Sequence, residues 1–149
     1  EVIAGIRNVR AEMNVPPGKR APALIRTSGE QLDSLNTQSG YLSDLGKIDG
    51  LTIGADVEKP AHSATVVIGN QTEVYVPMEG LIDVDQERSR LSKELAKQEK
   101  YVTGLEKKLS NEQFLSKAPP EVVEAEREKL STGIGQQDRL RRNLEALTE

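Results

Sequence analysis

The feature that most constrains this fold is a long stretch without proline, from Asp83 to Ala118. Apolar side chains recur in it at alternating spacings of four and three residues, the pattern of a heptad repeat. They are Leu91, Leu95, Val102, Leu105 and Leu109, with Arg88 and Gln98 as polar exceptions at two further core positions. Asp83 followed by Gln86 is typical of a helix start. The pattern predicts a helix over residues 83–109, about 40 Å long at roughly 1.5 Å per residue.

A second helix is predicted to begin near Pro120, because proline is favoured at the first helical position. Its inward side chains are predicted to be Val123, Leu130, Ile134, Leu144 and Leu147, with Gln137 polar and a slip in spacing around Leu140. Gly133 and Gly135 each cost about 1 kcal/mol relative to Ala, so a kink or local fraying is expected there. Two helices of similar length joined by a short turn predict an antiparallel coiled-coil hairpin over residues 81–149.

Residues 1–80, which precede the predicted hairpin, contain shorter apolar patterns. An apolar stripe of Val2, Ile6, Val9 and Met13 predicts a helix over residues 1–14, which the Pro16-Pro17-Gly18 segment ends. Residues 15–80 are predicted to form a small α/β module with a β-hairpin turning at Gly69-Asn70. Its strands are predicted at residues 23–27, 50–54, 64–68 and 72–76. The expected fold class is therefore α+β, a small mixed α/β module followed by a long antiparallel two-helix coiled-coil hairpin.

Two short helices are predicted between the first two strands. Ser28 and Gln31 fit a capping box that opens a helix with Leu32 and Leu35 inward. A second helical turn is suggested by Tyr41, Leu42 and Leu45.

The predicted tip of the hairpin carries the only Phe of the chain, Phe114. One interpretation is structural: Phe114 and Leu115 fold back over Val122 and Val123 and close the end of the hairpin. The other is functional, because an aromatic ring at an exposed tip can stack on an unpaired nucleic-acid base.

Basic side chains form a stripe on the side of the first long helix that faces away from the seam. They are Arg90, Lys93, Lys97, Lys100 and Lys107. The stripe is roughly 25 Å long and could follow a phosphate backbone, although the chain has a net charge of −4. The alternative is an ordinary solvated exterior, since Lys is a good helix former.

Candidate catalytic chemistry is missing from the sequence. His62 is the only His, and there is no Cys, so neither a metal cluster nor a nucleophilic triad is predicted. Gly18-Lys19-Arg20 lacks the upstream Gly and the following Ser/Thr of a phosphate-binding loop. We predict no catalytic, cofactor-binding or metal-binding residue. No apolar run approaches the roughly 20 residues of a membrane span, and a cytoplasmic protein is expected.

Three segments resemble the carboxy-terminal end of bacterial valyl-tRNA synthetase, a class I aminoacyl-tRNA synthetase. They are "VIAGIRNVRAEMNVPPGK" (2–19), "VYVPMEGLIDVDQERSRLSKELAK" (74–97) and "KKLSNEQFLSKAPPEVVEAEREKL" (107–130). The last segment is the most specific. The resemblance implies that residues 1–14 end the helical anticodon-binding region and that the hairpin packs against the outer corner of the tRNA, where the D and T loops meet.

The resemblance also implies that ATP and valine are handled by upstream domains, because the two nucleotide-binding signatures of the family are missing here. The chain is expected to be a non-catalytic, monomeric piece of a valine–tRNA ligase, with no cofactor of its own and valine-specific tRNA as its partner. The candidate tRNA-binding residues are Arg90, Lys93, Lys97, Lys100, Lys107, Phe114 and Lys117. The alternative function is a structural coiled-coil module for protein interaction or dimerisation.

Overall fold

The computed structural model describes residues 1–149, which form two compact units. The first unit contains residues 1–87 together with 146–149, and the second contains residues 88–145. The predicted domain boundaries at residues 14 and 80 stay a prediction, but the α+β class is confirmed by a four-stranded sheet followed by long helices.

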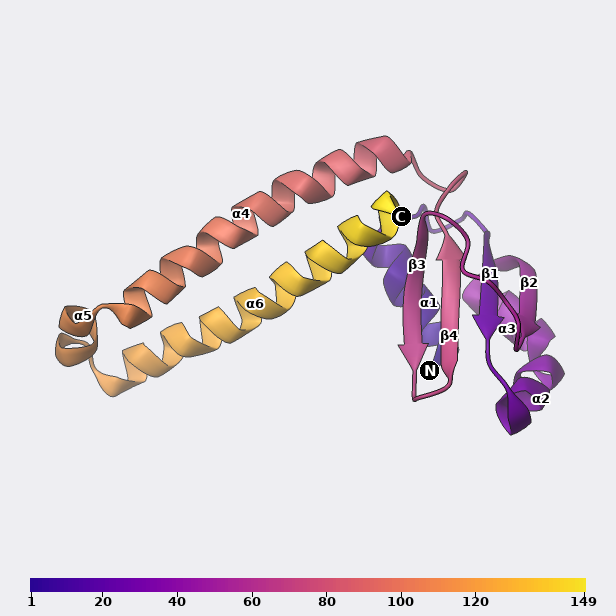
Figure 1. Ribbon diagram of the computed structural model, residues 1–149, viewed down its shortest axis with the longest axis horizontal. Coiled ribbons are helices and arrows are strands. Elements are labelled where there is room, and N and C mark those ends of the chain that lie inside the picture. The colour runs from indigo at the N-terminus through magenta and orange to yellow at the C-terminus, as the bar shows by residue number, and fades with distance from the viewer. The chain divides into compact units, whose positions relative to one another are not determined.

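The sheet of the first unit is mixed. Its strands are β1 (Ala21–Arg26), β2 (Ile48–Gly54), β3 (Ser63–Ile68) and β4 (Thr72–Pro77), in the order β2-β1-β4-β3 (Figure 1). β1 and β2 run parallel, whereas β4 is antiparallel to both of its neighbours. Parallel strands need a crossover connection, and α2 (Gly29–Thr37) and α3 (Ser39–Gly46) supply it between β1 and β2.

The hairpin predicted at Gly69-Asn70 is confirmed. Ile68 of β3 pairs with Thr72 of β4, so three residues form the loop between the strands. Gly69 has a φ of +61°, in the left-handed region that residues with a side chain rarely adopt. The glycine therefore makes the tight reversal possible.

The core of the first unit lies between the sheet and α1 (Val2–Glu12). Ile6 of α1 and Met13 after it are fully buried, as are Ile25 of β1 and Val74 of β4. A Cβ on Gly5 would lie 2.6 Å from Cγ1 of Val66, so α1 approaches the sheet too closely for a larger residue. The predicted stripe from Val2 to Met13 thus faces the core.

The predicted capping box is wrong. Ser28 is the N-cap of α2, but its side chain makes no capping hydrogen bond. Oε1 of Gln31 instead accepts a hydrogen bond from the hydroxyl of Thr72 at 2.6 Å. The amide therefore ties α2 to β4, because a buried hydroxyl on the neighbouring strand offers it a partner. The two short helices are confirmed, although Tyr41 and Leu45 are exposed.

The second unit is an antiparallel helical hairpin built from most of α4 (Val84–Ser110) and α6 (Pro120–Thr148). Lys108 near the end of α4 pairs with Glu126 near the start of α6, and Glu99 pairs with Arg141 farther from the tip. Within the first unit, a carboxylate oxygen of Asp83 accepts from the backbone amide of Gln86 at 3.1 Å, which confirms the predicted helix start.

The connection at the tip is longer than the predicted short turn. It contains an additional helix, α5 (Glu112–Lys117), whose N-cap is Asn111 (Figure 1). The side chain of Asn111 accepts a hydrogen bond from the backbone amide of Gln113 at 3.0 Å. This local cap starts a new helix one residue after α4 ends.

α6 is a single helix from Pro120 to Thr148, so the predicted fraying near Gly133 and Gly135 is wrong. The predicted seam is also wrong at one position, because Ile134 is 40% exposed and Gly133 is buried in its place. With that change the seam positions alternate four and three residues without a slip. They are Val123, Glu126, Leu130, Gly133, Gln137, Leu140, Leu144 and Leu147.

Candidate nucleic-acid interface

The basic side chains of residues 1–78 are all held by groups of their own unit. Five donate hydrogen bonds to backbone carbonyls and two pair with carboxylates; they are Arg7, Arg10, Lys19, Arg20 and Lys47, then Arg26 and Lys59. Arg10 is the most buried of them, and burial lowers the pKa of its guanidinium from the usual value. Its donors join the carbonyls of Pro16 and Lys19, which close the loop after α1. These cations stabilise the module.

The basic stripe of α4 differs from this arrangement. Lys93, Lys97, Lys100 and Lys107 are exposed, and no carboxylate of the chain pairs with any of them. A row of unpaired ammonium groups on a rigid helix creates a positive potential along one face. The residues that the sequence predicted for this stripe therefore lie together on the exposed side of α4, and their contact with RNA stays a prediction.

Arg90 is the exception among the predicted stripe residues. It is half-buried, and one of its guanidinium nitrogens lies 2.7 Å from a carboxylate oxygen of Glu94, one helical turn along α4. The pair neutralises part of the charge at the start of the stripe. Arg90 is thus a weaker candidate for phosphate binding than the four lysines.

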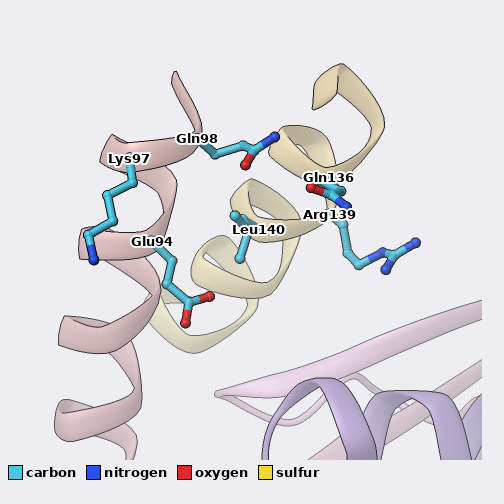
Figure 2. Close-up of a pocket in the computed structure, with 6 residues that line it drawn as sticks. All are labelled: Glu94, Lys97, Gln98, Gln136, Arg139 and Leu140. Carbon is cyan, nitrogen blue, oxygen red and sulfur yellow. The ribbon is translucent and has the colours of Figure 1, made fainter. Parts of the chain in front are cut away.

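A groove of about 390 Å³ runs beside the seam of the hairpin (Figure 2). It is lined by Glu94, Lys97 and Gln98 of α4 and by Gln136, Arg139 and Leu140 of α6. Figure 2 shows the side chain of Gln98 reaching towards α6, whereas Lys97 and Arg139 extend outward from the groove. The groove therefore has cations at its edges, whereas the carboxylate of Glu94 and the side chain of Leu140 lie between the two helices.

The tip of the hairpin is organised around Lys108. Its ammonium lies 5.0 Å from the centroid of the Phe114 ring, within the range of a cation–π contact. The same ammonium lies 3.5 Å from a carboxylate oxygen of Glu126. Leu115 is 37% exposed and Val122 is 41% exposed, so the predicted closure of the tip by these two side chains is wrong. Phe114 is half-buried, with Lys108 over one face of its ring.

Glu126 occupies a buried seam position and binds two cations. Lys129 donates to its Oε1 at 3.1 Å, and Lys108 approaches its Oε2. The hydrogen bond from Lys129 is the largest cause that lowers the pKa of Glu126, and the charge of Lys108 adds to it against the opposing effect of desolvation. The carboxylate is therefore held in its charged form between α4 and α6.

Two residues at the tip were missed by the sequence analysis. Glu126 lies three residues after Val123 and four before Leu130, so a strict heptad register would have identified it as a seam residue. Lys108 lies next to Lys107 of the stripe, and its position one residue along the helix turns it towards Phe114. Lys117, the last residue of α5, is exposed and carries no ion pair within the chain.

The largest pKa shift in the chain belongs to Tyr75, which lies in a cluster of polar side chains on the sheet. The hydroxyl of Tyr75 donates to a carboxylate oxygen of Glu73 at 2.5 Å, and Arg26 donates to the same oxygen at 2.8 Å. Burial, followed by this hydrogen bond, raises the pKa of Tyr75 to about 12. The phenol therefore stays protonated near neutral pH. The ion pair between Arg26 of β1 and Glu73 of β4 links the two strands, so the cluster has a structural role.

The described residues 1–149 contain neither a metal cluster nor a membrane-spanning helix. No group of three or more His, Asp or Glu residues is arranged to hold a metal ion. His62 has a left-handed φ of 53°, and its Nδ1 lies 3.8 Å from a carboxylate oxygen of Glu79. None of the helices is both long and apolar enough to cross a bilayer.

Comparison with known proteins places the hairpin in a sequence family. Residues 83–148 match the family described as "Valyl tRNA synthetase tRNA binding arm". The whole chain is similar to valine–tRNA ligases, with 47% identity over 149 residues to that of Syntrophotalea carbinolica, which covers 99% of this chain and 16% of the relative. The ligases of Geobacter sulfurreducens and Bacillus subtilis are 39% and 36% identical over 148 residues, which cover 99% of this chain and 17% of each relative. The chain therefore spans about a sixth of the length of these curated relatives.

Proposed function

This chain belongs, through residues 83–148, to the family of valyl-tRNA synthetase tRNA-binding arms, and on that premise we propose that its hairpin binds the outer corner of tRNA. The corner is the place where the D and T loops meet. The proposal includes valine-specific tRNA as the partner and support of aminoacylation as the outcome. Binding is electrostatic along α4, and the tip sets the position of the arm on the RNA.

The observation that carries this proposal is the distribution of unpaired cations. Every Lys and Arg of residues 1–78 is held by a carbonyl or carboxylate of its own unit, whereas four lysines on one face of α4 have no such partner. Cations that neutralise phosphates release counterions from the nucleic acid, and this release supplies much of the affinity. The stripe supports RNA binding by the arm even though the chain as a whole is acidic.

The remaining roles follow from the same family membership. We propose that the chain acts as a monomer in the cytoplasm, as part of a valine–tRNA ligase whose other domains bind ATP and valine. A module for protein dimerisation is the alternative. The hairpin supports the monomer, because its seam is already filled from within, for example by the hydrogen bond that Gln98 of α4 donates to the carbonyl of Gly133 of α6.

Titration of a labelled valine tRNA transcript with the chain at several salt concentrations tests the proposal. We expect a dissociation constant that rises with salt, with a slope of roughly 0.7 to 0.9 log units per log salt for each neutralised phosphate. Sedimentation of the same samples reports whether the chain is monomeric. A chain that dimerises and does not bind tRNA at low salt would contradict the proposal and support the alternative.

A further inference from the structure

The basic face of α4 is interrupted once, by a glycine. Residues 93, 97, 100, 104 and 107 are spaced by four, three, four and three, which places them on one side of the helix. Four of these positions carry the unpaired lysines described above, and the fifth is Gly104. Glycine is the least favourable helix residue apart from proline, so its place in the middle of a long helix requires a reason.

Packing within the chain does not supply that reason. A Cβ added to Gly104 would meet nothing within 4 Å. Gly133 differs, because its Cβ would lie 3.3 Å from Val102, and so does Gly5, whose Cβ would lie 2.6 Å from Val66. The missing side chain at 104 leaves bare backbone on the exposed surface of α4, and the gap that it leaves between Lys100 and Lys107 is called the notch.

The side chains beside the notch are of the types that bind phosphates and stack on bases. The helix neighbours of Gly104, three and four residues away, are Lys100, Tyr101, Lys107 and Lys108. Lys100 and Lys107 have no partner in the chain, whereas Lys108 is held at Phe114 and Glu126. Two free ammonium groups therefore stand on either side of bare helix backbone.

Tyr101 adds an aromatic surface to the same notch. Its side chain is 49% exposed, and its Cε1 lies 3.4 Å from the place of a Cβ on Gly133. One edge of the ring therefore rests against the backbone of α6 while the rest is open to solvent. A ring held in this way loses little conformational freedom when it binds a ligand.

We propose that RNA crosses α4 at the notch formed by Gly104, with phosphates on Lys100 and Lys107 and an unpaired base or ribose against Tyr101. This inference rests on the proposed function and assigns two residues, Gly104 and Tyr101, that the basic stripe alone does not include. The occupant is RNA because lysines neutralise phosphates and every base has a face that stacks on an aromatic ring. The glycine allows the sugar–phosphate backbone to approach the helix without a clash.

The test fills the notch without changing the charge. Gly104→Gln places a long neutral helix former there, and Gly135→Gln is the matched control, because Gly135 of α6 is also open, with nothing within 4 Å of an added Cβ. Both variants should melt at or above the temperature of the unchanged 149-residue chain. Binding of a labelled valine tRNA transcript should weaken by about tenfold for Gly104→Gln, with an unchanged salt slope because no cation is removed. The control should bind within about twofold of the unchanged chain.

Tyr101 provides a second, independent measurement. Tyr101→Phe keeps the ring and should retain the affinity, whereas Tyr101→Leu should lose at least about fivefold, the lower end of the value of one aromatic stack. Failure of the unchanged chain to bind tRNA would overturn the proposed function and this inference together. If the unchanged chain binds tRNA in a salt-dependent way and both Gly104→Gln and Tyr101→Leu bind it with the same affinity, the inference about the notch is wrong but the proposed function stands.

Discussion

The side-chain amide of Gln98 donates a hydrogen bond to the backbone carbonyl of Gly133 at 3.0 Å, across the seam between α4 and α6. Position 133 has no side chain, which leaves room for Gln98 and Val102 of α4 close to the backbone of α6. A Cβ there would lie 3.4 Å from Nε2 of Gln98 and 3.3 Å from Cγ2 of Val102. A glycine that is unfavourable for an isolated helix is thus explained by the close approach of the partner helix.

This contact predicts that substitutions at the two glycines of α6, Gly133 and Gly135, change the stability of the hairpin in opposite directions. Gly135→Ala should stabilise the hairpin by up to about 1 kcal/mol, because Ala is the better helix former and the site is open. Gly133→Leu should destabilise it by roughly 1–3 kcal/mol, since the larger side chain must displace Val102 and break the bond to Gln98. Urea unfolding followed by circular dichroism measures both. A Gly133→Leu variant as stable as the unchanged chain would contradict the observed seam.

The lysine stripe predicts that removal of its charges makes tRNA binding less dependent on salt concentration. Replacing Lys93, Lys100 and Lys107 together by Gln should weaken tRNA binding and reduce the salt slope by roughly 0.7 to 0.9 for each lost phosphate contact. Folding should change little, because exposed substitutions usually alter stability by less than about 0.5 kcal/mol. Lys59→Gln, which removes an exposed cation paired with Glu149, is the control and should leave the slope unchanged. An unaltered slope in the triple variant would show that the stripe is only a solvated helix face.

We predict that Phe114 mainly stabilises the tip of the hairpin and that its substitution affects tRNA affinity chiefly through the loss of stability. Phe114→Ala should destabilise the hairpin by about 1–2 kcal/mol, less than a fully buried Phe, because the ring is half-buried and lies under Lys108. Phe114→Leu should restore most of the stability and most of the tRNA affinity. Thermal melting and tRNA titration of the same variants separate the two effects. Restored stability with affinity still lost would show that the open face of the ring stacks on a base.

The lowered pKa of Glu126 predicts that the tip of the hairpin becomes less stable in acid. Its folded pKa is lowered from the ordinary value of 4.5, chiefly by the hydrogen bond from Lys129, so its contribution is complete above pH 4.5. The contribution is lost as the pH falls through the folded value and the carboxylate takes up a proton. Glu126→Gln should therefore be less stable than the unchanged chain at pH 7, and the difference should shrink towards pH 3.

Denaturant unfolding at several pH values measures this difference. Glu124→Gln is the control, because Glu124 pairs only with the exposed Arg127 at 3.8 Å, and such surface pairs contribute little. A difference for Glu126→Gln that stays constant from pH 7 to pH 3 would mean that the charge of Glu126 is not what stabilises the tip.

The absence of the family's nucleotide-binding signatures predicts that this chain has no synthetase activity alone. A purified preparation should show neither valine-dependent exchange of pyrophosphate into ATP nor aminoacylation of tRNA. Addition of valine and ATP should also leave its melting temperature unchanged, because a ligand that binds the folded state would raise it. Valine-dependent exchange above background would contradict the assignment of catalysis to other domains.

The features that sequence alone determined are those that depend on local periodicity and chain breakers. The stripe from Leu91 to Leu109 required a long helix with a partner, and Pro120 marked the start of that partner. The hairpin at Gly69 and the basic stripe of α4 were found in the same way, because spacing along one element decides which residues share a face.

Tertiary structure alone decided which of two neighbouring residues enters the seam. Gly133 and Ile134 differ by about 100° around α6, and hydrophobicity favours Ile134. Tyr101 and Val102 of α4 come so close that even a Cβ at position 133 would be tightly packed and a larger side chain would have to displace them, so Gly133 turns inward and Ile134 faces solvent. Lys108 likewise meets Phe114 and Glu126 only because α5 and α6 return the chain to it. Such choices depend on contacts between residues far apart in the chain, which the spacing within one helix does not contain.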